Sequence, residues 1–376
     1  LNNNLGATHQ SPAATAAENE VVRAFGELVG WDNPGGSMVS GGSMATLTAM
    51  LLMRQKYFPN WRVRPGVGAE EATIFTSSSS HFSVAKALRI AGFADESLRT
   101  LVGGERGSMQ PASLRAAIEA DIRAGRRPIC VVATLGTTGT GAVDELDAIA
   151  GVCKAYGLWL HVDACYGGAS LLLPELGHLT RGIERADSVA IDPHKWFFVP
   201  LVNALLLTPH RELETRAFAV DDASYIPGHG THAYDRGIYC SRRANSMTLW
   251  TALRAHGWSE LREVVRENIR LTRRLECALA SHGFEVLEGG ELSTACARFV
   301  PEAMAAQGVD MLQGAIAAKA CDSGETWFAT TRHAGTTWLR FNIVNLHTSE
   351  SDVDAIAQLV SDLAHASCAT ILEIQP

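Results

Sequence analysis

The 376-residue chain lacks the cysteine spacing that a disulfide scaffold or a structural zinc site requires. Its eight cysteines are scattered, and none forms a CxxC pair or a cluster with metal-type spacing. Scattered cysteines are typical of proteins that work in a reducing compartment. We therefore expect a cytoplasmic location, with no disulfide framework and no bound metal.

The sequence also lacks an apolar run long enough to span a bilayer, and it shows no signal peptide. The sequence also lacks a strong excess of charge of one sign, because it has 32 Lys and Arg residues and 40 Asp and Glu residues. The resulting net charge of −8 argues against a nucleic-acid partner. We expect neither nucleic acid nor membrane among the partners of the chain.

What the sequence does have is a globular composition, 47% hydrophobic and 19% charged, over a length that exceeds one ordinary core. One large and one smaller domain are therefore expected. Strand and helix patterns alternate from residue 72 to 207, which predicts a mostly parallel sheet with helices on both faces. Beyond residue 258, a long amphipathic helix, three alternating strands and a final helix predict a small α/β domain.

The most informative stretch of the sequence, residues 187–196, places a lysine between two apolar runs. Residues 189–191 predict a buried strand that Pro193 ends, and Lys195 follows directly before the apolar run 196–199. Lysine is seldom buried without a chemical reason, and desolvation favours the neutral amine that condenses with a carbonyl. The alternative is a lysine that extends along apolar surface to reach water.

An earlier stretch, residues 158–168, places an acid after an apolar strand pattern, as residues 187–196 place the lysine. Alternating apolar residues lead to Asp163, and small residues follow it. Two parallel strands joined by a crossover would bring Asp163 and Lys195 to one edge of a sheet. A carboxylate and a Schiff-base lysine are what pyridoxal 5′-phosphate (PLP) requires, because the acid keeps the pyridine nitrogen protonated and the lysine carries the aldehyde.

A glycine-rich turn precedes an expected helix over residues 45–56. A turn of this kind presents free N–H groups and the positive end of the helix dipole, which suits a phosphate. The alternative is an ordinary serine N-cap. Because Lys195 and Asp163 already indicate PLP, we expect Gly42 and Ser43 to hold its phosphate.

Two motifs, Asp-Ala at 163–164 and Asp-Pro-His-Lys-Trp at 192–196, resemble the group II PLP-dependent amino acid decarboxylases, and the likeness covers nearly the whole chain. That family includes the aromatic-amino-acid, tryptophan, glutamate and cysteine-sulfinate decarboxylases. The resemblance implies the PLP-dependent transferase fold, fold type I and aspartate aminotransferase-like, with a mostly parallel central sheet and a smaller α/β C-terminal domain. It implies a remnant of an N-terminal arm at 1–13, a large PLP-binding domain at 14–257 and a small domain at 258–376.

The resemblance also implies roles for four residues at the cofactor. His81 would stack on the face of the PLP ring, Thr138 in a Gly-Thr-Thr turn would lie at the cofactor, and His194 would bind beside the lysine. Asp144 matches an aspartate near the Schiff base. The alternatives are a helix-cap histidine for His81, a plain turn for Thr138 and an N-cap for Asp144.

Two further roles concern the substrate. In the resembled family a loop tyrosine returns a proton to the substrate carbon, and Tyr225 is the best match, with Tyr234 and Tyr239 as competitors. Arg340 matches an arginine that meets the carboxylate of acidic substrates in that family. A structural ion pair is the alternative for Arg340.

Taken together, the resemblance implies decarboxylation of an L-amino acid to its amine and CO2 by a homodimer. An aromatic substrate is slightly favoured, although Phe82 and Cys165 depart from the aromatic-specific pattern. The alternatives are oxidative deamination to an aldehyde, decarboxylation of an acidic amino acid, and a non-catalytic PLP-binding protein. The chain begins at Leu1, and we expect that the family's helical N-terminal arm is missing from this sequence.

Overall fold

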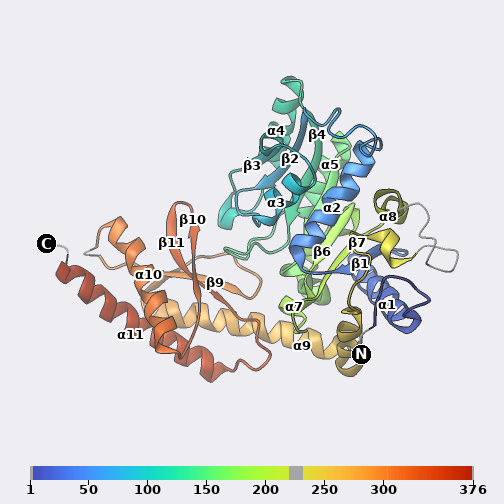
Figure 1. Cartoon of the computed structure of the whole chain (residues 1–376). Helices are drawn as coiled ribbons and strands as arrows, with labels where there is room; N and C mark the ends of the chain where they lie inside the picture. Colours follow the sequence, from blue (N-terminus) through green and yellow to red (C-terminus); the bar gives the residue numbers. More distant parts are fainter. Residues whose placement is uncertain (1–2, 220–231, 303, 375–376) are drawn as a thin grey trace. The chain divides into compact units, whose positions relative to one another are not determined.

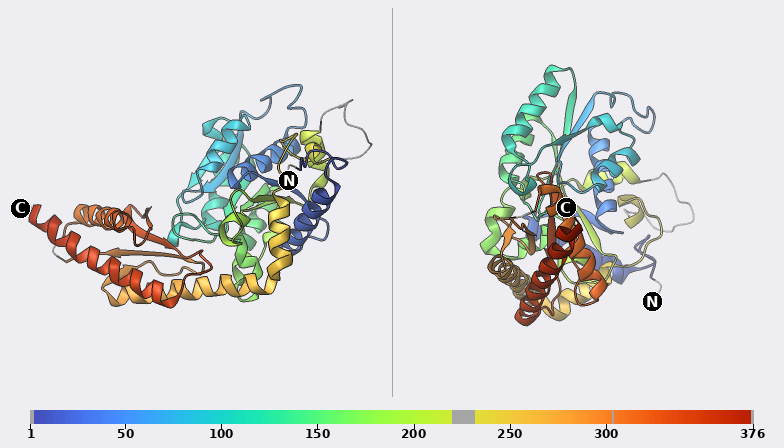
Figure 2. Two further views of the ribbon diagram at one scale, coloured as in Figure 1. Left: turned by 60° about the horizontal axis from the view of Figure 1, so that its bottom comes forward. Right: turned by 90° about the vertical axis from the view of Figure 1, so that its left-hand side faces the viewer.

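The computed structural model describes residues 3–219, 232–302 and 304–374 (Figure 1). The chain divides into two compact units, each of which Figure 2 shows from two further sides. The first unit comprises Leu1–Gly103, Ser108–Leu135 and Val143–Leu261. The second comprises Gly104–Gly107, Gly136–Ala142 and Arg262–Pro376.

This division differs in detail from the domain limits expected from the sequence. Two loops of the expected large domain, 104–107 and 136–142, group with the second unit instead. The segment expected as an arm remnant groups with the first unit. There the backbone N–H of Leu5 donates to the carbonyl of Arg242 at 2.9 Å, so a main-chain hydrogen bond fixes this segment to its own unit.

A seven-stranded sheet in the order β1-β7-β6-β5-β4-β2-β3 forms the centre of the first unit. Its strands are β1 (Gly35–Val39), β2 (Ala72–Ser77), β3 (Leu98–Leu101), β4 (Arg127–Thr134), β5 (Trp159–Asp163), β6 (Ser188–Ile191) and β7 (Ala204–Thr208). Neighbours from β3 to β6 pair in parallel, whereas β7 is antiparallel to both β6 and β1. The expected mostly parallel sheet is therefore confirmed, with β7 as its reversed strand.

Helices cover both faces of this sheet (Figure 1). One face carries α2 (Gly42–Tyr57), with α3 (Ser83–Ile90) and α8 (Arg211–Phe218) beside it. The other carries α1 (Pro12–Val29), α4 (Pro111–Arg123) and α5 (Leu146–Tyr156). The shorter helices of the unit are α6 (Gly177–Thr180) and α7 (Pro193–Trp196), and α9 (Ser246–Ser281) begins in it and is interrupted at Gly257. Among the described residues, the 3₁₀ helices are η1 (Asp95–Ser97), η2 (Glu105–Gly107), η3 (Gly167–Leu172), η4 (Pro174–Leu176), η5 (Ile183–Arg185) and η6 (Ala233–Arg236).

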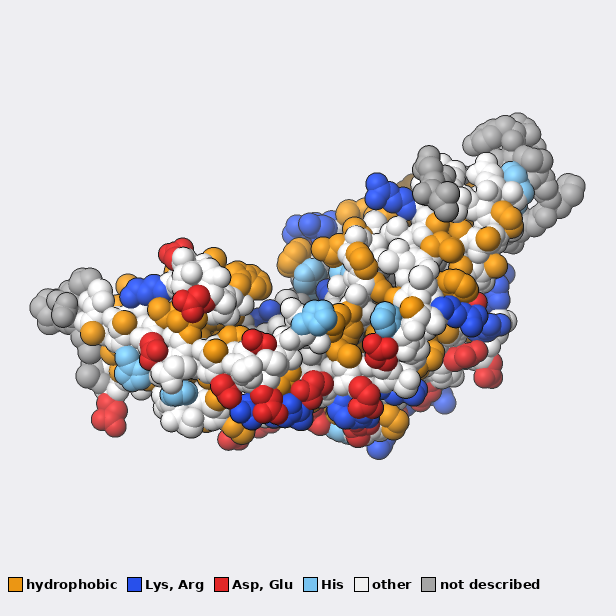
Figure 3. Space-filling model, turned by 90° about the horizontal axis from the view of Figure 1, so that it is seen from below, with side chains coloured by type: hydrophobic (Ala, Val, Ile, Leu, Met, Phe, Trp, Pro, Cys, Tyr) orange, Lys and Arg blue, Asp and Glu red, His pale blue; other side chains and the backbone are white. Residues whose placement is uncertain are grey.

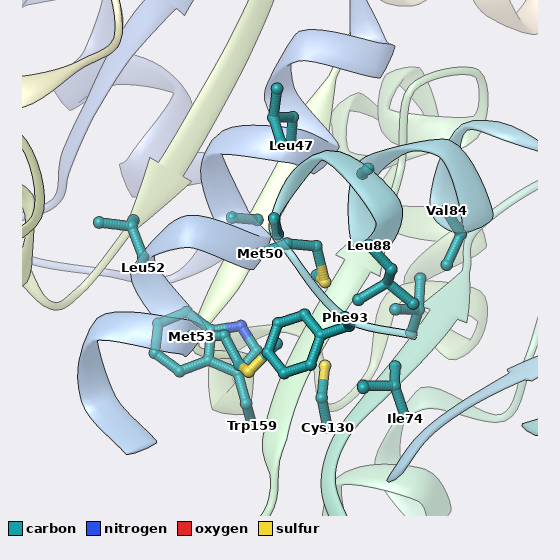
Figure 4. Packing of buried hydrophobic residues seen from close by; sticks show 14 of the residues in the cluster. Leu47, Met50, Leu52, Met53, Ile74, Val84, Leu88, Phe93, Cys130 and Trp159 are labelled. Carbon is teal, nitrogen blue, oxygen red and sulfur yellow. The ribbon is translucent and has the colours of Figure 1, made fainter. Parts of the chain in front are cut away.

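The core between α2 and the sheet is apolar and closed. Met50 and Met53 of α2 are completely buried, and Figure 4 shows them beside Phe93, Cys130 and Trp159. Burial of one such side chain contributes about 1.5–3 kcal/mol. This packing fixes α2 on the sheet, and with it the place where the first turn of the helix begins.

Strand β1 was not predicted, because it opens with two glycines and strand propensity is low for glycine. Gly36 lies so close to β7 that an added Cβ would clash with the carbonyl oxygen of Leu206. Its φ of 132° is also one that glycine adopts most readily. The strand therefore exists because of a close backbone approach that a side-chain pattern does not reveal.

The second unit contains a four-stranded antiparallel sheet in the order β10-β11-β9-β8. Its elements are β8 (Phe284–Val286), β9 (Thr294–Phe299), α10 (Ala306–Ser323), β10 (Ala329–His333), β11 (Thr336–Asn342) and α11 (Glu350–Ile374), with the later part of α9. Its own apolar core includes the buried Leu271, Leu312, Leu339 and Val353. This arrangement confirms the expected small α/β domain.

Charges of both signs are intermingled on the surface, as the face drawn in Figure 3 shows. Within the second unit, Arg270 and Arg274 of α9 pair with Glu350 of α11 at 2.7 and 3.1 Å. Exposed pairs of this kind contribute about 0–1 kcal/mol each. Among the residues that the structure describes, no helix is long and apolar enough to cross a membrane.

Candidate active site

The carboxyl ends of the parallel strands in the first unit carry the central predicted residues. Asp163 is the last residue of β5, where it pairs with Thr134 of β4 and Ala190 of β6. Lys195 lies in α7, directly after β6, and His81 follows the end of β2. In open α/β sheets ligands bind outside the carboxyl ends of the strands, so the topology collects these side chains where a ligand is expected.

The first turn of α2 adds a candidate phosphate site to the same edge. Gly41 has φ 96°, a conformation that favours glycine, and its carbonyl accepts the first intrahelical bonds from Met44 and Ala45 at 3.0 and 3.1 Å. The N–H groups of Gly42 and Ser43 precede this ladder and stand at the positive end of the helix dipole. Both features suit an anion, as the sequence predicted.

The side chain of Lys195 is partly exposed to solvent and forms an ion pair, although the sequence places it between two apolar runs. Its side chain is 40% exposed, and its Nζ lies 3.1 Å from Oδ2 of Asp192. Burial lowers the pKa of this amine, but neighbouring acidic groups, among them the carboxylates of Asp192 and Asp163, raise it more, and the net pKa lies above its ordinary value. The expectation of a neutral amine is therefore wrong for this arrangement, in which Lys195 is an ammonium held by a carboxylate.

Asp192 is a functional candidate that the sequence analysis did not single out. Its side chain is only 3% exposed, and among the described residues its Oδ1 has no hydrogen-bond partner. Burial raises the pKa of this carboxyl, against the opposing charges of Lys195 and His194. Its position directly after β6, at the same edge as Asp163, is the signal that could have identified it.

Cys165 connects the Asp163 carboxylate with the turn of α2. Its backbone N–H donates to Oδ1 of Asp163 at 3.1 Å, and its thiol is hydrogen-bonded to the same carboxylate. Its sulfur also fills the space beside Gly42, where a Cβ would clash with it. Burial raises the pKa of the thiol well above its ordinary value, so Cys165 stays protonated.

His81 presents a neutral imidazole to the same group of residues. Its Nδ1 accepts from the backbone N–H of Ser83 at 3.2 Å, and the ring of Phe82 lies 4.1 Å away between centroids. Burial lowers the pKa of His81, although the negative charge of Asp163 opposes this, while Lys195 lowers the pKa further. With Nδ1 accepting, Nε2 carries the proton, and the ring can stack on a flat ligand while donating from its other edge.

His194 is fixed by the loop that leads to β7. Its Nδ1 bonds to the backbone carbonyl of Asn203, and its Nε2 lies 3.7 Å from Oδ2 of Asp192. The structure thus brings His81, Asp163, His194 and Lys195 together with the turn of α2.

This donor set fits PLP on structural grounds. Lys195 offers an amine for the aldehyde, Asp163 offers a carboxylate for the pyridine nitrogen, and the turn without a Cβ at Gly42 offers N–H groups for the phosphate. Groups of His, Cys, Asp and Glu that could hold a metal ion are not found among the described residues.

The conserved domain of pyridoxal-dependent decarboxylases matches residues 1–300 of the chain. The chain belongs to the pyridoxal-dependent decarboxylase family. Its cofactor is PLP, in agreement with the site described above. The expected family and fold class are therefore confirmed.

Relatives of this decarboxylase-family chain include cysteine sulfinic acid decarboxylase of Rattus norvegicus, which is 36% identical over 302 residues and covers 78% of the chain. The aromatic-L-amino-acid decarboxylase of Bacillus atrophaeus is 28% identical over 341 residues and covers 89% of the chain. The chain spans 61% of the length of the rat protein and 69% of the length of the bacterial one.

Solved structures of the family agree with the fold. The crystal structure of mouse CSAD has a TM-score of 0.92 at 30% identity, with 96% of this chain and 78% of that chain covered. The structure of Oryza sativa TDC with PLP and tryptamine has a TM-score of 0.90 at 26% identity, with coverage of 97% and 79%.

The three remaining predicted residues of this decarboxylase-family chain do not belong to the described part of the first unit. Thr138 and Arg340 belong to the second unit, where Thr138 is exposed in its loop and Arg340 lies on β11. Within the described part of the chain, the buried Nε of Arg340 has no hydrogen-bond partner. Tyr225 lies outside the described residues.

The two competing tyrosines are described and differ in their surroundings. The hydroxyl of Tyr239 is hydrogen-bonded to Ser40, immediately before the glycine turn of α2. Tyr234 stacks on His232 with 5.3 Å between ring centroids. Tyr239 also lines a cavity of about 540 Å³ together with Arg243, so it is the described tyrosine beside the candidate phosphate turn.

Asp144 has a role that neither sequence interpretation foresaw. Its carboxylate accepts the backbone N–H of Met109 at 2.6 Å and that of Thr134 at 2.7 Å. Helix α5 begins only at Leu146, so Asp144 is not its N-cap. Burial raises the pKa of Asp144 to about 6, and its partners are main-chain groups that it holds in place.

Proposed function

We propose that the chain is a PLP-dependent L-amino acid decarboxylase that converts its substrate to the amine and CO2. The main support is that Lys195, Asp163 and His81 lie together at the carboxyl ends of the parallel strands, in a chain of the decarboxylase family. Because the chain spans about 61% of the rat relative, the activity is a proposal for the protein as a whole.

Each residue would make a distinct contribution. Bound PLP supplies an electron sink for the carbon that loses CO2. Asp163 would hold a proton on the pyridine nitrogen through its carboxylate, and Lys195 would bind the aldehyde through Nζ. His81 would cover the ring and direct its Nε2–H toward the substrate carboxylate. Tyr225, or Tyr239 beside the turn, would return a proton to the substrate carbon.

For the substrate we place acidic L-amino acids first and aromatic ones second. The rat relative acts on cysteine sulfinic acid, and a relative from Bos taurus at 33% identity is an acidic amino acid decarboxylase. The aromatic substrate favoured from the sequence is supported by the bacterial relative at 28% identity. We also propose that Arg340 binds an acidic side chain and Thr138 the cofactor, so Arg340→Gln would raise KM for acidic substrates more than for aromatic ones.

The deciding experiment is a panel of acidic, aromatic and aliphatic L-amino acids, scored for CO2 and amine. Lys195→Ala serves as the inactive control. Aldehyde with ammonia and peroxide would support the oxidative alternative instead. PLP binding without turnover of any substrate would support a non-catalytic protein.

We further propose that the protein is a homodimer located in the cytoplasm. Support for the cytoplasm comes from the eight cysteines, which are all free thiols in the structure. Support for the dimer comes from the family resemblance. Sedimentation equilibrium across a range of concentrations tests the dimer, and a mass of one chain at every concentration would refute it.

A further inference from the structure

The buried carboxylate of Asp192 stands between the lysine and the candidate phosphate turn. Its Oδ2 holds Nζ of Lys195 at 3.1 Å. A Cβ added to Gly42 would lie 2.8 Å from Oδ2 and 3.1 Å from Oδ1, so the carboxylate lies directly against this turn. Oδ1 is buried and has no partner among the described residues.

Asp192 has one close ammonium partner, Lys195, and a second carboxylate, Asp163, acts on it as well. The other titratable groups that act on this carboxylate are His194, with Nε2 at 3.7 Å, and Asp163. The charge of Asp192 also affects the pKa values of Cys165 and His81. Neither group compensates this charge, because the thiol is protonated and the imidazole is neutral. The Lys195 ammonium is therefore the main positive charge that compensates Asp192.

Cofactor binding would disturb this balance. A phosphate carries a charge of about −1.5 to −2 at neutral pH, and at the turn of α2 it would lie next to the Asp192 carboxylate. The nitrogen of Lys195, once bound to the cofactor, carries no more positive charge than before. Two anionic groups in one poorly solvated place are costly unless a proton is shared between them.

We propose that Asp192 and the PLP phosphate share a proton, which the protein takes up when PLP binds. The orphaned Oδ1 would then find its partner in a phosphate oxygen. This inference rests on the proposed placement of the phosphate at Gly42 and Ser43. It assigns Asp192 to cofactor binding, and makes PLP affinity depend on pH.

The test measures proton uptake directly. PLP is titrated into the cofactor-free protein by calorimetry in two buffers of different ionisation enthalpy, and pyridoxal, which lacks the phosphate, is titrated in parallel. Pyridoxal reports the protons exchanged at Lys195, so the difference between the ligands isolates the phosphate. At pH 8 we expect about one more proton taken up with PLP than with pyridoxal, and a PLP dissociation constant that rises up to about tenfold per pH unit.

The variants then assign the proton to a residue. Asp192→Asn keeps the shape and can donate to a phosphate without titrating, so it should abolish the extra uptake and bind PLP more tightly than the parent at pH 8. Asp95→Asn is the matched control, because Asp95 is an exposed aspartate paired with Arg89. His194→Gln tests the neighbouring imidazole as the proton carrier.

Three outcomes would overturn the inference: equal uptake with PLP and pyridoxal, unchanged uptake in Asp192→Asn, or uptake lost only in His194→Gln. Failure of the proposed function looks different. In that case neither PLP nor pyridoxal would give the visible absorbance of a lysine-bound cofactor, and Lys195→Ala would behave like the parent protein.

Discussion

At the scale of single residues, Cys165 offers a test of how the Asp163 carboxylate is held. The thiol and the backbone N–H of Cys165 both engage this carboxylate. Cys165→Ala removes one bond, so we expect the dissociation constant for PLP to rise about fivefold, as for a loss of about 1 kcal/mol. Cys165→Ser restores a donor and should bind PLP nearly as the parent does. Equal affinities of the two variants, measured by fluorescence titration, would contradict this role.

The residues with unusual chemistry at strand ends were predictable, and their charge states were not. Lys195 and Asp163 could be recognised because a lysine and an acid each follow an apolar strand. The ammonium form of Lys195 depends on the carboxylates of Asp192, three residues before it, and of Asp163, which approaches it from the end of β5. A single sequence does not reveal such a convergence, so desolvation alone gave the wrong direction for the pKa.

At the scale of elements, Asp144 links β4 to the segment that leads into α4. It accepts one backbone N–H from each, at Thr134 and Met109. Asp144→Ala leaves both buried donors unpaired, and we expect the free energy of unfolding to fall by about 2–4 kcal/mol. Asp144→Asn keeps one acceptor and should cost less. Urea denaturation of both variants measures this, and an Asn variant less stable than the Ala variant would count against the assignment.

Elements with a regular side-chain pattern were predicted to within a few residues, whereas elements defined by backbone contact were not. Helix α2 was expected over 45–56, and it begins instead at the glycine turn. Strand β1 was missed because Gly36 approaches β7 without a side chain. Grouping of the loop 136–142 with the second unit depends on contacts between segments far apart in the sequence.

At the scale of the whole molecule, cofactor binding should raise the stability of the folded chain. A ligand that binds only the folded state at about 100 times its dissociation constant adds about 2.7 kcal/mol. We expect PLP to raise the melting temperature, measured by differential scanning fluorimetry. Lys195→Ala loses the covalent link and should show a smaller rise at the same PLP concentration. An equal rise in both proteins would mean that PLP binds without Lys195.

Whole-molecule stability should also depend on pH through Glu214, a buried carboxyl of α8. Its side chain is 1% exposed, and burial raises its pKa to about 7 from 4.5, despite the opposing charges of Arg236 and Arg211. Below pH 4.5 the carboxyl is protonated in both the folded and the unfolded chain, so it contributes no dependence on pH. Between about 4.5 and 7 only the unfolded chain ionises, so stability is lost as the pH rises.

Glu214→Gln cannot ionise and should remove this loss. We expect the variant to match the free energy of unfolding of the parent near pH 4.5. At pH 8 the free energy of unfolding of the variant should exceed that of the parent by about 1–3 kcal/mol, reduced by the attraction to Arg236 and Arg211 that the variant loses. Glu212→Gln is the matched control on the same helix, because Glu212 is exposed and should change stability by less than about 0.5 kcal/mol. Guanidinium unfolding at pH 5, 6, 7 and 8 gives the profile. A Glu214→Gln curve parallel to the parent curve would show that this carboxyl ionises equally in the folded and unfolded chains.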